Sequence, residues 1–212
     1  HYGFYLGINQ NDFKLNLRRS TPTPMSRYAN ITVEPTAGFN VGLIADFRLH
    51  KNLNLRLEPG LVSNSKRILF NHLKNSATAT KDSIRQDSIR EVGSTYLHIP
   101  LVFKFSTDRY KNIRPYLLAG VSYDYNFSSN ESNKEDNYTK QFRMTTHNFM
   151  YEVGIGVDFY LYYFKFSPSI RGVFAFNNEI KYDNPRLDGT PSKFTSPINF
   201  MGTRGIFLNF AF

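Results

Sequence analysis

The sequence predicts an all-β protein, a transmembrane antiparallel up-and-down β-barrel of about eight strands. Apolar and polar residues alternate over long segments, which is the period of a strand with one apolar face. Short and long polar connections between these segments alternate as well. The chain contains 20 Phe and 14 Tyr but no Trp, an aromatic load that suits strands and the aromatic girdles of membrane barrels.

The first expected strand runs from Tyr2 to Leu17. Its even positions are apolar up to Ile8, whereas its odd positions are apolar from Phe13 onwards. A change of parity within one strand indicates a β-bulge, here near Asn9 to Asn11. Two shorter strands are the alternative interpretation.

The next two strands form the clearest hairpin. The odd positions from Ala37 to Leu49 are all apolar, and Gly, Asn and charged residues occupy most of the positions between them. After a tight turn at residues 50–52, the odd positions of 53–61 continue the pattern. We therefore expect one face of this hairpin in lipid and the other in the barrel lumen.

Two further hairpins and a closing strand complete the expected barrel. Residues 96–105 pair with 113–127, and residues 149–159 pair with 164–176. The last segment, 205–212, points four apolar side chains to one side and ends on Phe212. This end is similar to the closing strand of bacterial outer-membrane β-barrels, which commonly ends in Phe. We expect Phe210 and Phe212 on the lipid-facing side.

The lengths of the connections predict the topology. They are short near residues 50–52, 106–112 and 160–163, and long and polar near 16–35, 66–94, 128–146 and 177–197. Outer-membrane barrels have short periplasmic turns and long extracellular loops. The sequence thus predicts a single barrel domain, 1–212, integral to the outer membrane, with both termini in the periplasm. Because the chain opens without a signal peptide, we expect a mature chain whose leader was removed.

Two soluble folds compete with this interpretation. No stretch approaches the ~20 apolar residues of a membrane helix, so a helical membrane protein is excluded. A lipocalin-like barrel would carry scattered Lys and Glu on its outer face, but one face of each expected strand is almost free of charge. A two-sheet sandwich would also bury that face and stays the main alternative, although it gives no reason for every second loop to be long.

The opposite face of the strands carries charges of both signs. An eight-stranded barrel is only wide enough for its own side chains. Burying an unpaired charge there would destabilise the fold by roughly several kcal/mol. We therefore expect a structural ion-pair network in the lumen, with a proton or ion path as the alternative. Its members are Asp46, Arg48, Arg56, Glu58, His98, Lys104, Arg114, Asp124, Glu152, Asp158, Lys165 and Arg171.

The formal net charge of +9 comes largely from the first two long connections. A basic collar there would bind phosphates of the outer-leaflet lipids. The sequence shows no helical basic stripe or aromatic platform for nucleic acid. The expected lipid-phosphate contacts are Arg18, Arg19, Arg27, Lys66, Arg67, Lys74, Lys81, Arg85 and Arg90.

The second long connection also contains a five-residue repeat, from Asp82 to Arg90. A solvated or locally helical loop is the simplest interpretation. Its Asp-Ser-Ile units also resemble an O-glycan acceptor pattern of exported Gram-negative proteins.

Signals for catalysis are weak, and we expect no enzyme, cofactor or small-molecule substrate. The chain has no Cys, hence no disulfide and no thiolate ligand or nucleophile. Gly154 and Gly156 lie in a strand and lack the third glycine of a dinucleotide loop. His72 and His147 lie in or beside long loops. A lipid-modifying enzyme would need a Ser or acid at a recognisable spacing from one of them, and the sequence shows none. No metal-ligand cluster is visible.

Three segments resemble the PorT family of outer-membrane barrels: HYGFYLGINQNDFK at the start, YLHIPL from Tyr96, and RPYLLAG from Arg114. The first is the best discriminator, because the other two recur in a broad superfamily of small barrels. The resemblance implies a component of the type IX secretion system, which exports folded cargo and in some bacteria supports gliding motility. Since side chains fill so narrow a lumen, it implies an accessory scaffold that contacts the translocon and outer-membrane lipids. No motif identifies the contacting surface.

Two other functions stay open. One is a general small barrel for adhesion or envelope integrity that acts through its external loops. The other is a lipid-modifying barrel enzyme that uses His72 or His147.

Overall fold

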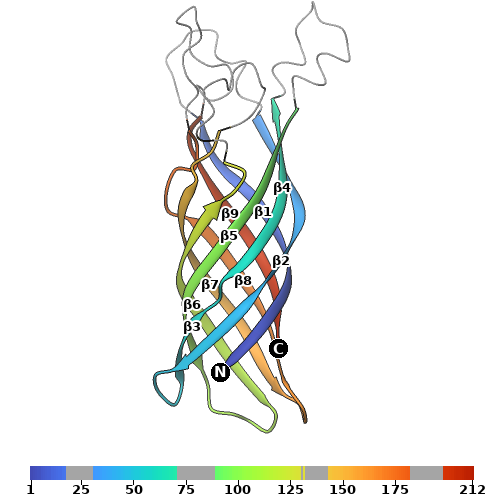
Figure 1. Ribbon diagram of the computed structural model, residues 1–212, viewed down its shortest axis with the longest axis vertical. Helices are drawn as coiled ribbons and strands as arrows, with labels where there is room; N and C mark the ends of the chain where they lie inside the picture. Colours follow the sequence, from blue (N-terminus) through green and yellow to red (C-terminus); the bar gives the residue numbers. More distant parts are fainter. Residues whose placement is uncertain (18–30, 71–88, 130, 132–142, 182–197) are drawn as a thin grey trace, which may run out of the picture.

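A computed structural model describes residues 1–17, 31–70, 89–129, 131, 143–181 and 198–212 (Figure 1). Within these ranges no helix is long and apolar enough to cross a membrane. The strands of the described residues are β1 (Tyr2–Leu17), β2 (Ile31–Arg48), β3 (Leu53–Leu57), β4 (Gly60–Phe70), β5 (Ile89–Ser106), β6 (Ile113–Asn126), β7 (His147–Tyr160), β8 (Lys165–Ala175) and β9 (Ile198–Ala211).

The strands close into one antiparallel ring. Apart from β3 and β4, which do not pair with each other, each strand pairs with its neighbours in the chain, and β1 pairs with both β2 and β9. β3 and β4 share one place in the ring, because both pair with β2 on one side and β5 on the other. The ring therefore has eight places, and the predicted up-and-down barrel is confirmed.

Three short connections lie at the end of the barrel that also holds both chain termini (Figure 1). They span residues 49–52, 107–112 and 161–164, whereas the connections at the other end are longer, so the predicted alternation of loop lengths is confirmed. Several strands extend beyond their predicted bounds, among them β9, which begins at Ile198 instead of near residue 205. β4 and β5 pair as far as Leu69 with Ile89, and β2 begins at Ile31. The ends of β4 and β5 lack the one-sided apolar pattern, so their sequence resembles a loop.

The predicted bulge in β1 is wrong. Its pairing with β2 and β9 runs without a break through Asn9 to Asn11, and the register shifts only at Asn16 and Leu17. Phe13 keeps the inward parity and is 3% exposed. What changes along β1 is the environment of its two faces, since the outer face becomes polar at Gln10 while the interior accepts an aromatic ring.

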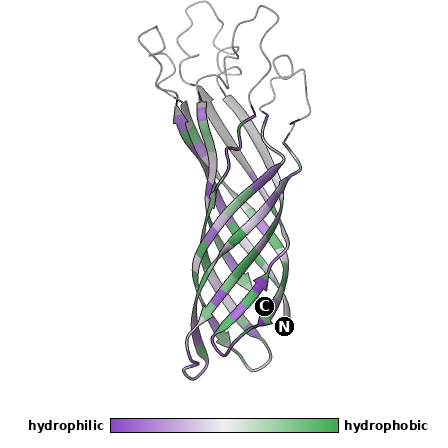
Figure 2. Ribbon diagram, turned by 90° about the vertical axis from the view of Figure 1, so that its left-hand side faces the viewer, coloured by the Kyte–Doolittle hydropathy of each residue, from purple (hydrophilic) through white to green (hydrophobic). Residues whose placement is uncertain are grey.

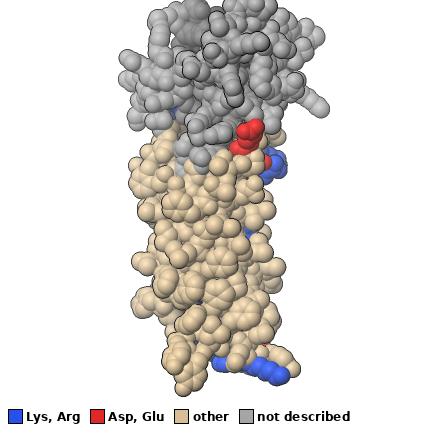
Figure 3. All heavy atoms as spheres, turned by 90° about the vertical axis from the view of Figure 1, so that its right-hand side faces the viewer, with Lys and Arg blue, Asp and Glu red and all other residues tan. Residues whose placement is uncertain are grey.

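Hydrophobic and hydrophilic residues are interspersed along the strands (Figure 2). The face in Figure 3 shows charged residues near both ends and almost none between them, and the exposed large apolar side chains form a belt around the wall. On β7, exposed apolar side chains extend from Phe149 towards Phe159. Ten residue steps at a rise of ~3.3 Å and a tilt of ~40° cover ~25 Å, the height of the apolar band of a membrane barrel. Aromatic pairs mark both margins of the belt, such as Tyr123 with Phe149 at one and Phe4 with Phe212 at the turn end.

Candidate functional site

Most of the charged side chains that the sequence predicts in the lumen lie there. Inward strand positions bury Asp46, Arg56, His98, Lys104, Asp124, Glu152, Asp158 and Arg171, and Glu58 is buried in the break between β3 and β4. The other three expected members lie at the mouth of the barrel at the turn end. There Arg48 is exposed, and Arg114 and Lys165 are half-buried.

Two arginines share one glutamate at the centre of this cluster. Arg171 Nη1 lies 2.6 Å from Glu58 Oε2, and Arg56 Nη1 lies 3.3 Å from Glu58 Oε1. Arg56 Nε also donates to Asp46 Oδ2 at 2.8 Å. Glu152 extends the chain of charges, since its Oε2 lies 3.8 Å from Arg171 Nη1. Each buried charge thus faces an opposite one, which offsets its desolvation.

His98 bridges two carboxylates across the lumen. Its Nδ1 lies 2.7 Å from Asp124 Oδ1 and its Nε2 lies 3.1 Å from Glu152 Oε1. A doubly protonated imidazole ring satisfies both by donating twice. The ring also stacks on Phe207, with centroids 5.8 Å apart.

Lys104 forms a second buried pair nearer the turn end. Its Nζ donates to both oxygens of Asp158, at 2.8 and 2.6 Å, and lies 3.9 Å from the centre of the Tyr116 ring. Ser167 donates to the same carboxylate at 2.6 Å. Below this pair, a polar cavity of about 450 Å³ opens at the turn end. It is lined by both mouth arginines and by Lys165, so it forms a basic vestibule.

An apolar layer closes the lumen beyond the charges. It consists of the buried side chains of Val62, Tyr96, Met150, Val173 and Phe207. The alternation of the sequence does not predict this layer, because it indicates polar side chains at the inward positions. Large apolar residues at the inward parity of each strand were the available signal.

Asparagine pairs and tight packing fill the remaining cross-section. Asn40 Nδ2 donates to Asn209 Oδ1, and Asn64 Nδ2 donates to Asn9 Oδ1, both at 2.7 Å. The cavity at the level of His98 measures about 10 Å³, which is about room for one water molecule. In the described part of the barrel, the vestibule is therefore closed at its inner end.

The remaining predicted residues lie elsewhere. The structure does not describe residues 82–88 of the repeat or His72, nor six members of the predicted collar: Arg18, Arg19, Arg27, Lys74, Lys81 and Arg85. Its other three members lie in strands rather than in a loop: Lys66 and Arg67 in β4, and Arg90 in β5. The sequence of these strand ends lacks a one-sided apolar pattern and therefore resembles that of a loop.

His147 belongs to the outer wall of β7, not to a catalytic cluster. It is exposed, its Nδ1 lies 2.6 Å from the Tyr123 hydroxyl, and its ring packs edge-on against Tyr125. Among the described residues, no group of three or more His, Cys, Asp or Glu could hold a metal ion. Both glycines of the Gly154 to Gly156 segment lie in β7.

The end of the chain lies in the seam of the ring. β9 pairs with β1 on one side and with β8 on the other. Phe212 is 40% exposed and stacks on Phe4 at 5.4 Å, and Phe210 stacks on Phe166 at 6.1 Å. Both rings thus add to the aromatic margin at the turn end.

Comparison with known proteins gives one family match. The profile of the outer membrane protein beta-barrel domain family matches residues 1–181. No curated protein matches the chain in sequence.

Solved structures of small outer-membrane proteins are similar in fold. The outer membrane protein OprG from Pseudomonas aeruginosa is 10% identical, with a TM-score of 0.48, covering 100% of this chain and 95% of that one. Neisserial surface protein A is 12% identical, with a TM-score of 0.44 and coverage of 98% and 95%. Ail, the attachment invasion locus protein of Yersinia pestis, is 10% identical, with a TM-score of 0.40 and coverage of 100% and 97%.

Proposed function

The chain belongs to the outer membrane protein beta-barrel domain family, and on that premise we propose that it is a non-enzymatic accessory component of the type IX protein secretion machinery. It acts as a scaffold in the outer membrane and does not conduct cargo. In bacteria that glide, the same role would support motility.

The closed lumen carries the non-conducting part of this proposal. Buried ion pairs centred on Glu58 and the apolar layer around Phe207 fill the cross-section in series. A folded cargo protein is far wider than an eight-stranded barrel whose interior its own side chains occupy. The protein therefore works through its surfaces.

The resemblance of three segments to the PorT family supports the secretion part. In the fold, His1 to Lys14 forms most of β1, while Tyr96 to Leu101 and Arg114 to Gly120 lie in the paired strands β5 and β6. The partners proposed are outer-membrane lipids and other secretion components, including the translocon. The short turns and both termini face the periplasm, as in other barrels of this class.

A deletion strain tests the proposal together with the purified barrel. Deleting the gene should abolish cargo export, and the wild-type gene should restore it. The purified protein should form no ion-conducting pores in planar bilayers, and secretion components should co-purify with it from native membranes. Robust large-pore conductance, or normal export without the gene, would show that the proposal is wrong.

A role in adhesion or envelope integrity is the second candidate. It is favoured by the polar outer wall of the barrel beyond the belt, where Lys14 is exposed and Arg204 pairs with Asp12 at 2.7 Å. Replacing the long connections with short turns separates the two functions. Failure of secretion supports the scaffold, whereas intact secretion with lost surface binding supports adhesion.

A further inference from the structure

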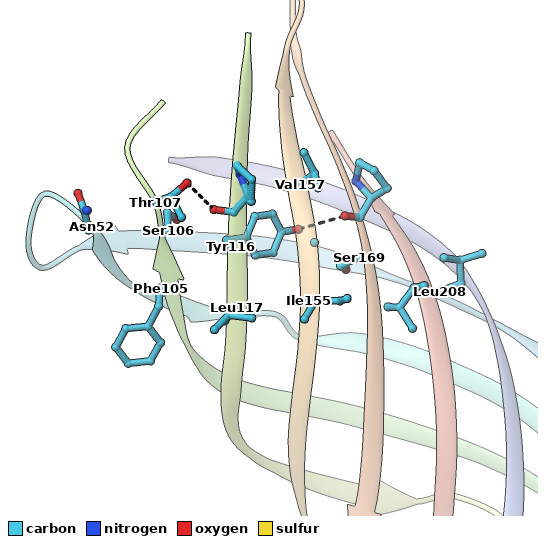
Figure 4. Close-up of a pocket in the computed structure, with 14 residues that line it drawn as sticks. Asn52, Phe105, Ser106, Thr107, Tyr116, Leu117, Ile155, Val157, Ser169 and Leu208 are labelled. Carbon is cyan, nitrogen blue, oxygen red and sulfur yellow. Dashed lines mark hydrogen bonds between the residues drawn. The ribbon is translucent and has the colours of Figure 1, made fainter. Parts of the chain in front are cut away.

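The lipid-facing wall is hollowed near the turn end of the barrel (Figure 4). The hollow has a volume of about 830 Å³, within the ~300–1,000 Å³ typical of ligand sites. Pro115, Val157 and Pro168 form a low row across β6, β7 and β8. Larger side chains border it, among them Leu117 and Ile155.

The pairing of β7 and β8 is interrupted at this hollow. Their pairing runs from Met150 to Gly156, stops, and resumes at Phe159. Pro168 lies within the unpaired stretch and has no N–H to donate to a neighbouring strand. The two strands therefore lack ladder hydrogen bonds where the wall is lowest.

One aromatic ring closes the wall behind the gap. Tyr116 points from β6 across Gly156, and its hydroxyl donates to the carbonyl oxygen of Pro168 at 3.5 Å (Figure 4). A Cβ on Gly156 would overlap that ring. The floor of the hollow is thus a buried side chain rather than a continuous backbone ladder.

The rim at the turn end is polar and basic. Asn52 and Thr107 line it. Arg114 is held beside them, because its guanidinium donates to the carbonyl oxygens of Thr107 and Lys51 at 2.8 and 2.9 Å. Lys51 pairs with Asp108 at 3.0 Å. Arg114 makes no salt bridge of its own among the described residues, but it interacts electrostatically with the same Asp108 carboxylate. Two cations against one carboxylate leave the rim positive.

We propose that this hollow binds a phospholipid of the periplasmic leaflet, with an acyl chain along the Pro115, Val157 and Pro168 row and the phosphate at Arg114. The hollow, called the trough below, is apolar and ends at a positive rim. This arrangement matches the amphipathic shape of an anionic phospholipid. The trough lies in the apolar belt and the rim lies at the margin of the belt. The acyl chain would therefore lie in the hydrocarbon layer of the membrane and the phosphate at the level of the lipid headgroups. This inference does not depend on the secretion role.

Lipid retention tests the acyl-chain site. The full-length barrel is reconstituted in nanodiscs of phosphatidylglycerol and phosphatidylcholine and transferred to detergent, and native mass spectrometry measures the phospholipid that stays bound. Val157→Trp fills the trough and should lower retention about tenfold, the loss expected from about two buried methylene groups. Val153→Trp is the matched control, because Val153 is an exposed outward residue of β7 outside the trough. It should retain lipid as the wild type does.

Two variants that each remove one positive charge test the phosphate site. Arg114→Gln should remove the preference for phosphatidylglycerol over phosphatidylcholine. Arg48→Gln should keep it, because Arg48 also lines the vestibule, as Arg114 does, but is not held against Thr107 at the rim of the trough. Heat-modifiable migration on gels verifies that each variant is folded. Equal lipid retention by the two Trp variants would overturn the proposal. So would a Val157→Trp variant that keeps its lipid but no longer co-purifies with a protein partner, because the trough would then be a protein docking site.

Discussion

At single positions, the barrel combines tyrosine rings with glycines on neighbouring strands. Tyr116 lies over Gly156, and Tyr5 lies over Gly42 and Gly60. A glycine on the inward face leaves room for a ring that then covers the exposed backbone, a device known as aromatic rescue. These glycines are therefore steric requirements of the narrow lumen, and the Gly154 to Gly156 segment needs no ligand to explain it.

We predict that Gly156→Val destabilises the barrel by about 1–3 kcal/mol, the usual cost of overpacking. The added side chain would meet the Tyr116 ring and the carbonyl of Pro168. Urea unfolding in lipid vesicles, followed by tyrosine fluorescence, measures the change. Ala119→Val is the matched control, because Ala119 is exposed on the outer face and the added methyl groups would enter lipid. Equal stability of the two variants would contradict the tight Tyr116 contact.

Glu131, beyond the end of β6, gives a prediction about pH. Hydrogen bonds from Thr146, and then from Lys181, lower the pKa of the Glu131 carboxyl from its ordinary 4.5 to about 2. The Thr146 backbone N–H donates to its Oε2 at 2.9 Å and Lys181 Nζ to its Oε1 at 3.1 Å. Because the pKa in the folded state is the lower one, the contact stabilises the fold fully above about pH 4.5 and is lost as pH falls through about 2.

The amide proton of Thr146 reports this titration by NMR. Its chemical shift should change with a midpoint of about 2. Lys181→Met should raise the midpoint only modestly, because Thr146 supplies the larger effect. A midpoint at the ordinary carboxyl value in the wild type would show that Thr146 does not hold the carboxylate.

At the scale of strands, the sequence predicts well wherever one face meets lipid. From Ala37 to Leu49 the exposed and buried residues follow the predicted parity closely, because lipid and lumen make opposite demands on neighbouring side chains. Beyond the belt both surroundings become polar or mixed. There the alternation no longer distinguishes the two faces. The inward Phe13 therefore leads to the wrong prediction of a bulge near Asn9 to Asn11, and the paired ends of β4 and β5 to the wrong prediction of a loop.

The position of the belt can be tested with arginine. Val153→Arg, near the middle of the exposed apolar stretch of β7, should destabilise the barrel by about 2–4 kcal/mol, the cost of Arg at the membrane midplane. Gln10→Arg, an exposed position of β1 beside the Asp12 and Arg204 pair, should cost about 0–1 kcal/mol. Unfolding in vesicles measures both. Similar costs would mean that the belt is not where the exposed apolar residues place it.

At the scale of the whole barrel, the sequence predicted the charges of the lumen but not their partners. Arg171 meets Glu58 from the other half of the chain, and His98 joins Asp124 to Glu152. These contacts depend on how the closed ring staggers its strands, which alternation alone does not encode. The apolar layer has the same origin, since its five side chains come from β4, β5, β7, β8 and β9.

The order of the layers leads to a prediction about conductance. The charged cluster and the apolar layer lie one after the other along the lumen, and we expect either one alone to block it. The double variant Met150→Ala, Phe207→Ala should therefore stay non-conducting in planar bilayers, although each truncation costs about 2–5 kcal/mol of stability. If export depends on the scaffold and not on a pore, the folded variant should also restore secretion in a deletion strain. Discrete conductance steps in the double variant would mean that the ion pairs around Glu58 and Arg171 do not close the barrel by themselves.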